Sequence, residues 1–374
     1  MLTLGQAAQA EFVCFATRVE QLADPRRRFA LSPEEFRRLN PNTLTCPVFR
    51  STRDAELTKK LYRAAPVLID ERRPDGNPWG IRFLAMLHMS NDSHLFADAP
   101  GAGRLPLYEG KMVQAYDHRA ASVEVNTANI VRAGQPKSTL LSEHRNPSFS
   151  VRPQSWIDRK EVNDRLGDWR SAWMIAFKSV TSPSNERTFI ASLVPECGLA
   201  NSLIGILPLV NDISRVACLF ANLNAIAFDY VARNKVGGVN LNFFLVKQLP
   251  AFPPDRYTAA DLAYIVPRVL ELTYTAHDLA AWAQDLGYDG SPFTFDPDRR
   301  AQLRAELDAC YARLYGLTRD ELRYILDPAD VLGADYPSET FRVLEKNEER
   351  DFSEYRTQRL VLAAWDALEQ GALP

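Results

Sequence analysis

The residue types with the most direct chemical potential lie around position 109. Glu109 and Lys111 have the E-x-K spacing of metal-dependent nucleases, in which carboxylates hold Mg²⁺ and a cation stabilises the developing charge. Asp75, beside Pro74, could supply a second carboxylate to the same ion. A two-residue spacing is common by chance, and Asp75 lies in a Pro/Gly turn instead of on a predicted strand. A Mg²⁺-dependent nuclease is therefore the alternative hypothesis and not the leading one.

A denser group of polar residues lies between positions 233 and 242. Arg, Lys and Asn are the residue types that bond guanine edges, phosphates and adenine edges, and glycine permits a positive φ and the close approach of another backbone. This combination predicts a segment close to DNA, whereas the alternative is an ordinary helix-to-strand turn with a polar edge. The predicted contacts are Arg233, Lys235, Gly237, Gly238, Asn240 and Asn242.

A second group of cations accompanies an aromatic segment that begins near position 105. We expect these cations to contact phosphates while Tyr108 or Tyr116 packs beneath them. The alternative is a rigid hinge between domains, which Pro106 and Gly110 would suit. The predicted phosphate contacts here are Lys111, His118 and Arg119, and Lys178 and Arg187 complete the predicted DNA-binding set.

Composition excludes several other classes of protein. The 374 residues are 46% hydrophobic and 24% charged, which is typical of a globular protein. Five dispersed cysteines and five scattered histidines give neither a disulfide framework nor metal-ligand spacing. Residues 1–20 lack the pattern of a secretory signal, and no apolar run reaches the roughly 20 residues that a bilayer requires. We expect a cytoplasmic protein without a membrane partner or a bound metal.

Charge is distributed unevenly along the chain. The net charge is −3, which by itself argues against a nucleic-acid partner. Residues 255–374, however, contain 13 Lys and Arg against 23 Asp and Glu, a net charge of −10, which leaves +7 for residues 1–254. A basic part that is separate from an acidic part is compatible with one nucleic-acid-facing region, although charge drift between two solvated domains would look the same.

The elements that must position these residues fall into three expected regions. Residues 1–105 mix short helices and loops, as in an N-terminal adaptor. Residues 106–254 contain short β-branched and aromatic runs, which predict an α/β (α+β) domain. Residues 255–374 follow helical patterns almost throughout and predict an all-helical C-terminal domain. The expected strands cover residues 122–125, 173–180, 188–194 and 241–245, the last within a strand-like stretch that begins at residue 239.

The strongest helix signals are local. An i, i+3, i+4 apolar repeat predicts one helix over residues 214–233. Ser32 followed by Pro33 predicts a helix start, and Thr318 with Glu321 forms a capping-box pattern. Further helices are expected over residues 54–65, 259–272, 274–286, 298–315, 318–325 and 351–369.

Three stretches together resemble a known family. They are LPLYEGKMVQAYDHR at 105–119, RNKVGGVNLNFFLVKQLP at 233–250 and LYGLTRDELRYIL at 314–326. In this order they resemble the region that follows the catalytic core in class I adenine-specific DNA methyltransferases, including type IIG restriction-modification enzymes and methylases of phage-defence systems. The resemblance covers roughly residues 45–365 and implies that residues 106–254 form a target-recognition domain, followed by a helical spacer.

The chain departs from this family where methyl transfer would take place. Such enzymes hold a flipped adenine with an Asn-Pro-Pro-Tyr type loop and bind S-adenosylmethionine through a glycine-rich strand-to-helix turn. The closest strings here are Asn146-Pro147-Ser148-Phe149 and Pro100-Gly101-Ala102-Gly103, which we interpret as a turn and a linker.

The resemblance therefore implies sequence-specific recognition of double-stranded DNA without catalytic residues or a cofactor in this chain. S-adenosylmethionine is expected in a partner methyltransferase subunit or in a catalytic domain outside this sequence. Besides the nuclease, one further alternative stays open, in which the chain is a fragment that docks to a methylase without touching DNA.

Overall fold

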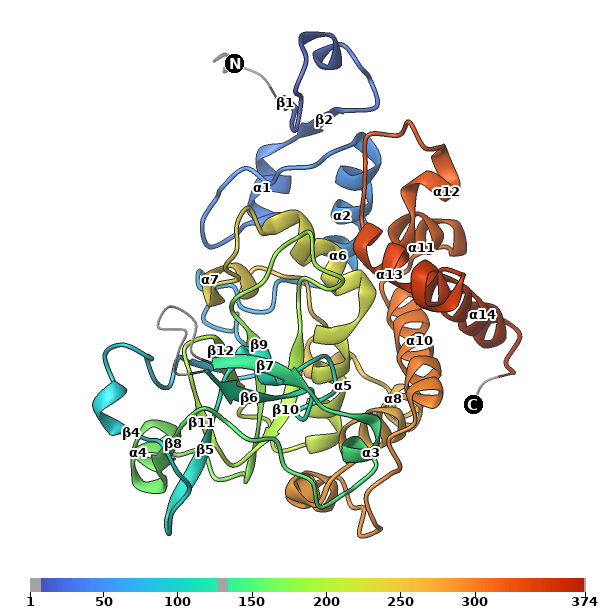
Figure 1. Ribbon diagram of the computed structural model, residues 1–374. Coiled ribbons are helices and arrows are strands. Elements are labelled where there is room, and N and C mark those ends of the chain that lie inside the picture. The colour runs from blue at the N-terminus through green and yellow to red at the C-terminus, as the bar shows by residue number, and fades with distance from the viewer. Residues whose placement is uncertain (1–7, 127–133, 373–374) are drawn as a thin grey trace.

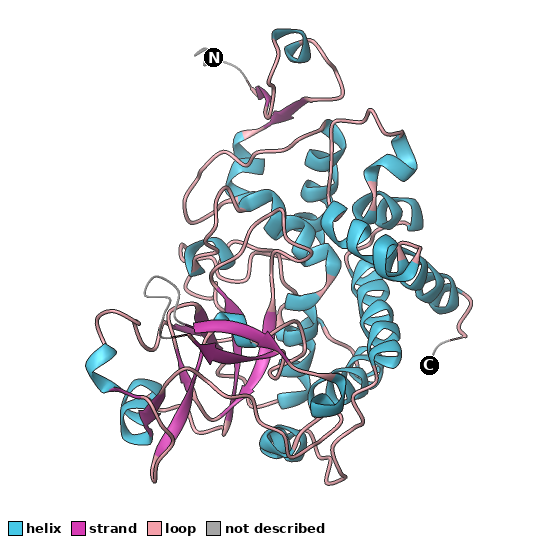
Figure 2. Cartoon of the chain, viewed as in Figure 1, coloured by secondary structure: helices cyan, strands magenta, loops and turns pink. Residues whose placement is uncertain are grey.

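The computed structural model describes residues 8–126 and 134–372 as a mixed α/β fold. In Figure 1 the larger sheets lie at the lower left and the C-terminal helices along the right, with the N-terminal elements at the top. Figure 2 shows the same division by type of element. This confirms the mixed fold class and the helical character of the C-terminal part.

The central sheet has the strand order β10 (Ala191–Pro195), β9 (Trp173–Lys178), β12 (Leu203–Leu207) and β3 (Arg82–Leu84), and all neighbours are antiparallel. Side chains alternate between its two faces, as the period of a strand requires. Along β9, Trp173, Ile175 and Phe177 enter one hydrophobic cluster, while Met174 and Ala176 enter a second one on the other face. Both faces are thus covered, which explains the nearly continuous apolar run in the sequence.

Helices cover the first face. α5 (Ile213–Asn224) and α6 (Ile226–Lys235) replace the single helix predicted over residues 214–233. The break lies at Ala225, whose extended backbone (φ −66°, ψ 144°) ends α5 and begins α6. Asp308 from a later helix accepts a hydrogen bond from the first amide of α6, Ile226 N, at 2.7 Å. A partner more than 80 residues away in the sequence stabilises this break, so the local apolar repeat could not predict it.

A second small sheet covers the other face. Its strand order is β11 (Gly198–Leu199), β5 (Arg104–Tyr108), β8 (Trp156–Asp158) and β4 (Phe96–Ala97). Leu105 and Leu107 of β5 belong with Ile157 of β8 to the second hydrophobic cluster. A separate two-stranded ribbon consists of β6 (Ala121–Val125) and β7 (Gly134–Ser138).

The C-terminal part is helical as predicted, and its capping signals are present. Thr318 caps its helix through Glu321 N, and the Glu321 carboxylate bonds Thr318 N in return. The predicted helix over 351–369 starts later, because Ser353 adopts a left-handed conformation (φ 60°) between two helices. Likewise, only part of the predicted helix over 274–286 forms. The α-helices are α8 (Ala259–Thr273), α9 (Ala280–Asp285), α10 (Pro297–Leu314), α11 (Arg319–Leu326), α12 (Pro328–Leu332), α13 (Arg342–Phe352) and α14 (Arg356–Glu369).

The N-terminal elements join this helical part directly. Asp54 on α2 is buried and accepts hydrogen bonds from Tyr230 of α6 (2.9 Å), Tyr324 of α11 (3.0 Å) and Ser338 (3.0 Å). Ser32 caps α1 with a full capping box, as its sequence predicts. The elements before the central sheet are β1 (Ala10–Val13), β2 (Arg28–Leu31), α1 (Pro33–Leu39) and α2 (Thr52–Ala64).

The predicted domain boundaries at residues 105 and 254 do not divide the hydrophobic core. One cluster extends from Phe29 to Trp365 and therefore contains residues of all three predicted regions. Strand β3 of the predicted adaptor completes the central sheet, and Trp79 Nε1 donates to Phe252 O at 2.9 Å. None of the helices in the described ranges is long and apolar enough to traverse a bilayer.

The stretch at residues 239–246, predicted as a strand, is mostly not one. Asn240 forms only an isolated bridge with Val180, and the chain then turns into the short helix α7 (Phe243–Val246). Leu241 and Val246 are buried, whereas Phe243 and Phe244 are exposed. This spacing buries residues five apart, which fits a loop that enters a helix and not the alternation of a strand. The remaining short helices are α3 (Leu141–His144) and α4 (Arg159–Leu166).

Candidate DNA-contacting surface

Arg119, predicted to contact phosphate, lies inside the protein. Its guanidinium donates to the carbonyl oxygens of Asn146 (2.9 Å) and Phe149 (3.1 Å) through Nη1, and to those of His144 (2.9 Å) and Thr275 (3.0 Å) through Nη2. These acceptors belong to two chain segments, so Arg119 fastens the loop at residues 144–149 to the end of α8. Its role in this structure is to hold the fold together, which corrects the sequence prediction.

Arg233 and Arg187 are also turned inward. Arg233 donates to the carbonyl oxygens of Pro183, Asn185, Glu186 and Thr340 and lies 3.5 Å from the Asp229 carboxylate. Arg187 donates to the Asp308 carboxylate at 3.2 Å. Asp229 itself accepts the backbone amides of Thr188 and Phe189 at 2.9 and 2.6 Å, which fixes the loop that leads into β10. Arg233 is not available to DNA in this arrangement, and Arg187 reaches solvent only at the wall of a cleft.

Lys235 and His118 have internal partners as well. Lys235 Nζ donates to Leu39 O at 2.7 Å and to Asn40 Oδ1, which ties the end of α6 to the end of α1. Burial lowers the pKa of this lysine well below its ordinary value. His118 Nε2 lies 2.9 Å from the Asp278 carboxylate. The prediction that these two side chains contact DNA is thus also corrected, because both reach into the protein.

The nuclease residues do not form a metal site. Asp75 is exposed and paired with Arg73 Nη2 at 2.6 Å, whereas Glu109 is paired with Lys111 Nζ at 3.0 Å in a different environment beside Gly110 and Ser202. Among residues 8–126 and 134–372, no three His, Cys, Asp or Glu side chains converge as metal ligands. The arrangement gives the Mg²⁺-dependent alternative no geometric support.

The glycine- and asparagine-rich part of the predicted cluster does reach the surface. Gly237, Gly238, Asn240 and Asn242 are all exposed. Both glycines also have open space where a Cβ would lie, and neither has the positive φ expected from its residue type. Their neighbours are apolar and exposed, namely Val180, Val239, Phe243 and Phe244. Phe243 packs on Phe83 of β3 with ring centroids 6.0 Å apart.

The β6–β7 ribbon gives a second exposed surface. In Figure 1 it lies in front of the two larger sheets. Ala121 and Val123 of β6 are buried against the body, whereas Ser122, Glu124, Gln135 and Lys137 share the opposite face of the ribbon in the register Ser122↔Lys137 and Glu124↔Gln135. Alternation thus gives the ribbon one apolar side and one polar side.

Hydrogen bonds hold the base of the ribbon. Val123 N donates to Arg152 O at 2.7 Å, and Arg152 N donates to Ser122 Oγ at 3.0 Å. On the other strand, Lys111 Nζ donates to Gly134 O at 3.0 Å. These contacts connect both strands to the body, so the polar face has a defined position.

Three cations lie near the ribbon, and Lys137 is the one that belongs to its polar face. Lys137 pairs with Glu124 at 2.6 Å and Lys111 with Glu109, while the exposed Arg152 side chain has no ion-pair partner among the described residues. Lys111 is a predicted contact that lies near the ribbon, but on the side of the body, where its Nζ is 3.0 Å from the position that a Cβ on Gly134 would occupy. Lys178, in contrast, is half-buried on β9, and burial lowers its pKa to about 8.

Strand β7 does not follow from the sequence pattern, and its residue Lys137 is not among the predicted contacts. Pro136 explains the omission, since a proline within a short run argues against a strand. It is tolerated here because β7 has only β6 as a neighbour in its sheet. The cross-strand pair Glu124–Lys137 would have been a usable signal.

Comparison with known proteins adds no family to this description. No protein-family model matches the chain, and a search of curated proteins finds no match either.

Proposed function

We propose that this chain is the sequence-recognition part of an adenine-specific DNA methyltransferase system of the restriction-modification or phage-defence type. It binds double-stranded DNA in the cytoplasm, and a partner subunit or domain supplies S-adenosylmethionine binding and methyl transfer. The proposal rests on the resemblance of residues 105–119, 233–250 and 314–326 to that family, together with one structural observation.

That observation is the exposed polar face of the β6–β7 ribbon. The major groove of B-DNA accepts a two-stranded β-ribbon, and hydroxyl, amide and charged side chains are the types that bond base edges and phosphates. Ser122, Gln135 and Lys137 occupy this face. Arg152, beside β6, provides a charge for the phosphate backbone. In this proposal the ribbon contacts DNA in place of Arg119 and Arg233, which the sequence predicted as DNA contacts.

The exposed apolar residues around α7 are candidates for contact with the methyltransferase partner. A contiguous apolar surface on a globular protein often marks a protein interface, and Val239, Phe243 and Phe244 lie within the segment that carries the family resemblance. This surface also keeps the docking-only alternative in place, because docking to a methylase needs no DNA contact from this chain.

The test is selection of bound sequences from random duplex DNA, with a salt series on the selected duplex. We expect one enriched sequence, and the double variant Lys137→Glu/Arg152→Glu should lower the slope of log K against log salt by about 0.9 for each phosphate contact removed. Arg18→Glu is the matched control. Arg18 belongs to the segment that connects β1 and β2, and this segment lies at the top of Figure 1, away from the ribbon.

The experiment is run with the chain alone and with the methyltransferase encoded beside it. Co-purification of the two proteins without DNA binding by either preparation would favour the docking-only alternative. Equal loss of binding in the ribbon variant and in the Arg18 control would contradict a role of the ribbon.

A further inference from the structure

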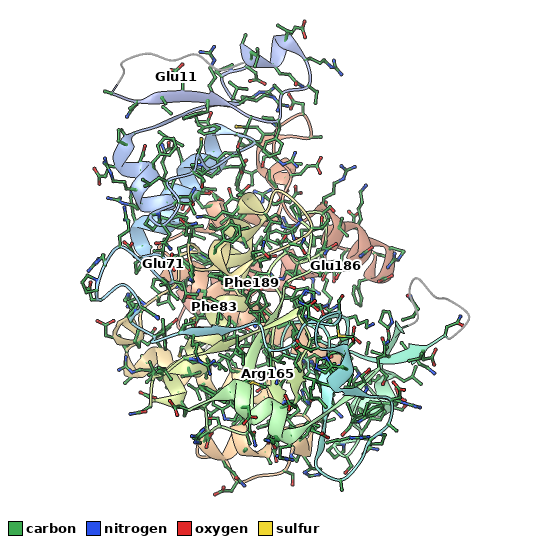
Figure 3. The ribbon with its side chains drawn as sticks, turned by 90° about the vertical axis from the view of Figure 1, so that its left-hand side faces the viewer. Glu11, Glu71, Phe83, Arg165, Glu186 and Phe189 are labelled. Carbon is green, nitrogen blue, oxygen red and sulfur yellow. The ribbon has the colours of Figure 1, made fainter. Side chains whose placement is uncertain are left out.

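A cleft of about 380 Å³ lies where α10, α13 and the turn at residues 114–117 meet. Figure 3 labels Glu186, which lines it. Arg304 of α10 and Arg187 bring two guanidinium groups to its wall, and Leu344 and Phe352 of α13 bring apolar surface. None of these residues belongs to the ribbon or to the exposed loop at residues 237–244, so the cleft is independent of the proposed function.

The carboxylates around the cleft already have partners within the protein. Asp308 accepts hydrogen bonds from Ile226 N and from Arg187, and Glu348 accepts them from Thr357 N (2.7 Å) and Thr357 Oγ1 (2.6 Å). Asp351 pairs with Arg350 at 2.7 Å, and Glu186 bonds Asn347. None of these acids is therefore reserved for an arginine that lacks a partner.

Arg304 is the exception in this otherwise satisfied arrangement. Its guanidinium has no hydrogen bond or ion pair with any residue in the described ranges, although the side chain is open to solvent through the cleft. Surrounding protein atoms and the like charge of Arg187 lower the pKa of Arg304, although Asp308 and Glu348 offset part of this. Nη1 of Arg187 is buried without a hydrogen-bond acceptor, although it lies 3.9 Å from the Asp229 carboxylate.

The exposed guanidinium of Arg304 keeps all its donors for an anion in the cleft, and Arg187 adds a second positive charge to the same wall. A guanidinium binds phosphate oxygens through several N–H groups at once, and such charge-assisted bonds are stronger than neutral ones. A ring or sugar attached to that phosphate would meet Leu344 and Phe352. Its hydroxyl or amino groups would meet carboxylate oxygens of Glu348 and Asp351.

We propose that this cleft binds a phosphate monoester such as a nucleoside monophosphate, with the phosphate held by Arg304 and Arg187 and the organic part held against α13. The positions of the charged residues around the cleft agree with this placement of the phosphate and of the organic part. The arginines lie on the side of α10 and the loop before β10, and Glu348 and Asp351 lie on α13.

The test is thermal unfolding of the whole chain with four probes: AMP, ribose 5-phosphate, adenosine and inorganic phosphate. A ligand that binds only the native state raises Tm with concentration. We expect AMP and ribose 5-phosphate to raise Tm by several degrees and adenosine to leave it unchanged. Inorganic phosphate should act more weakly, because it lacks the part that meets α13.

Arg304→Gln is the decisive variant. It should weaken the effect of AMP by about tenfold or more in concentration, since the charge-assisted bonds are lost. Arg299→Gln on the same helix is the matched control, because Arg299 pairs with Glu271 outside the cleft, and it should keep the full AMP response. Without ligand, Arg304→Gln should leave Tm nearly unchanged, because Arg304 is exposed and has no hydrogen bond or ion pair to lose.

The opposite results would overturn the proposal. A lower Tm of ligand-free Arg304→Gln would show that Arg304 stabilises the fold instead of a ligand. No response of the native chain to AMP or ribose 5-phosphate, a response to AMP that survives in Arg304→Gln, or equal responses to AMP and inorganic phosphate would each exclude a phosphate-monoester site.

Discussion

Lysines and arginines in this chain serve two different purposes, and the side-chain environment distinguishes them. Arg233 and Lys235 donate to carbonyl oxygens of distant segments, whereas Lys137 and Arg152 face solvent. Lys178 belongs to neither group. It extends from the central sheet without any hydrogen-bond acceptor for its ammonium among the described residues, and burial lowers its pKa to about 8.

Lys178 should therefore destabilise the native state at neutral pH. Because its folded-state pKa of about 8 lies below the ordinary lysine pKa of 10.5, the unfolded chain binds more protons between these two values, and stability rises with pH across that window. We expect Lys178→Met to raise the free energy of unfolding at pH 7 by about 1–3 kcal/mol. Urea titrations at pH 7, 9 and 10.5 measure this gain.

The gain should shrink toward pH 10.5, where the lysine is neutral in the folded state and already half neutral in the unfolded state. Lys160→Met is the control, since Lys160 is exposed on α4. A stability gain that is the same at all three pH values would show that packing, and not the charge, causes it.

Individual elements differ in how far the sequence predicts them. Helices α1 and α11 were predicted with their caps, because Ser32 and Thr318 act on residues only three positions away. The break at Ala225 and the burial of Arg119 depend on partners far along the chain, Asp308 and Thr275 among them. Sequence patterns carry the first kind of information and not the second, which is why the cations of the candidate site were assigned to the surface.

The loop at residues 144–149 illustrates such a long-range dependence. Arg119 supplies donors to three of its carbonyl oxygens and to Thr275 O, and replacement by methionine leaves these acceptors without donors in a buried region. We expect Arg119→Met to lower the free energy of unfolding by about 3–5 kcal/mol. Equilibrium urea denaturation is the measurement.

Arg152→Met is the control for Arg119→Met, because we expect it to change the free energy of unfolding very little. Only its backbone is bonded to β6, so stability should change by no more than about 0.5 kcal/mol. Similar losses in the two variants would mean that the Arg119 hydrogen bonds contribute little. A lower DNA affinity of Arg119→Met at temperatures where it is folded would restore the surface role first assigned to it.

At the scale of the whole molecule, one hydrophobic cluster contains residues of all three predicted regions, and buried polar groups join these regions. The Asp54 carboxylate on α2 accepts hydrogen bonds from four hydroxyl groups. The donors are Ser51 at the N-cap of α2, Tyr230 of α6, Tyr324 of α11 and Ser338 in the segment before α13. These hydrogen bonds connect residues 1–105, predicted as an adaptor, to the helices that follow the sheets. Unfolding of the N-terminal helices should then expose the C-terminal ones as well.

Asp54→Ala tests this coupling, because it leaves four buried hydroxyl groups without their acceptor. We expect a loss of about 3–5 kcal/mol in the free energy of unfolding, with amide exchange rising together in α2, α6 and α11 when followed by mass spectrometry. Asp98→Ala, at an exposed position, should leave both quantities unchanged. Faster exchange confined to α2 would instead mean that the N-terminal part unfolds independently, and the boundary predicted near residue 105 would regain its meaning as a limit of cooperative folding.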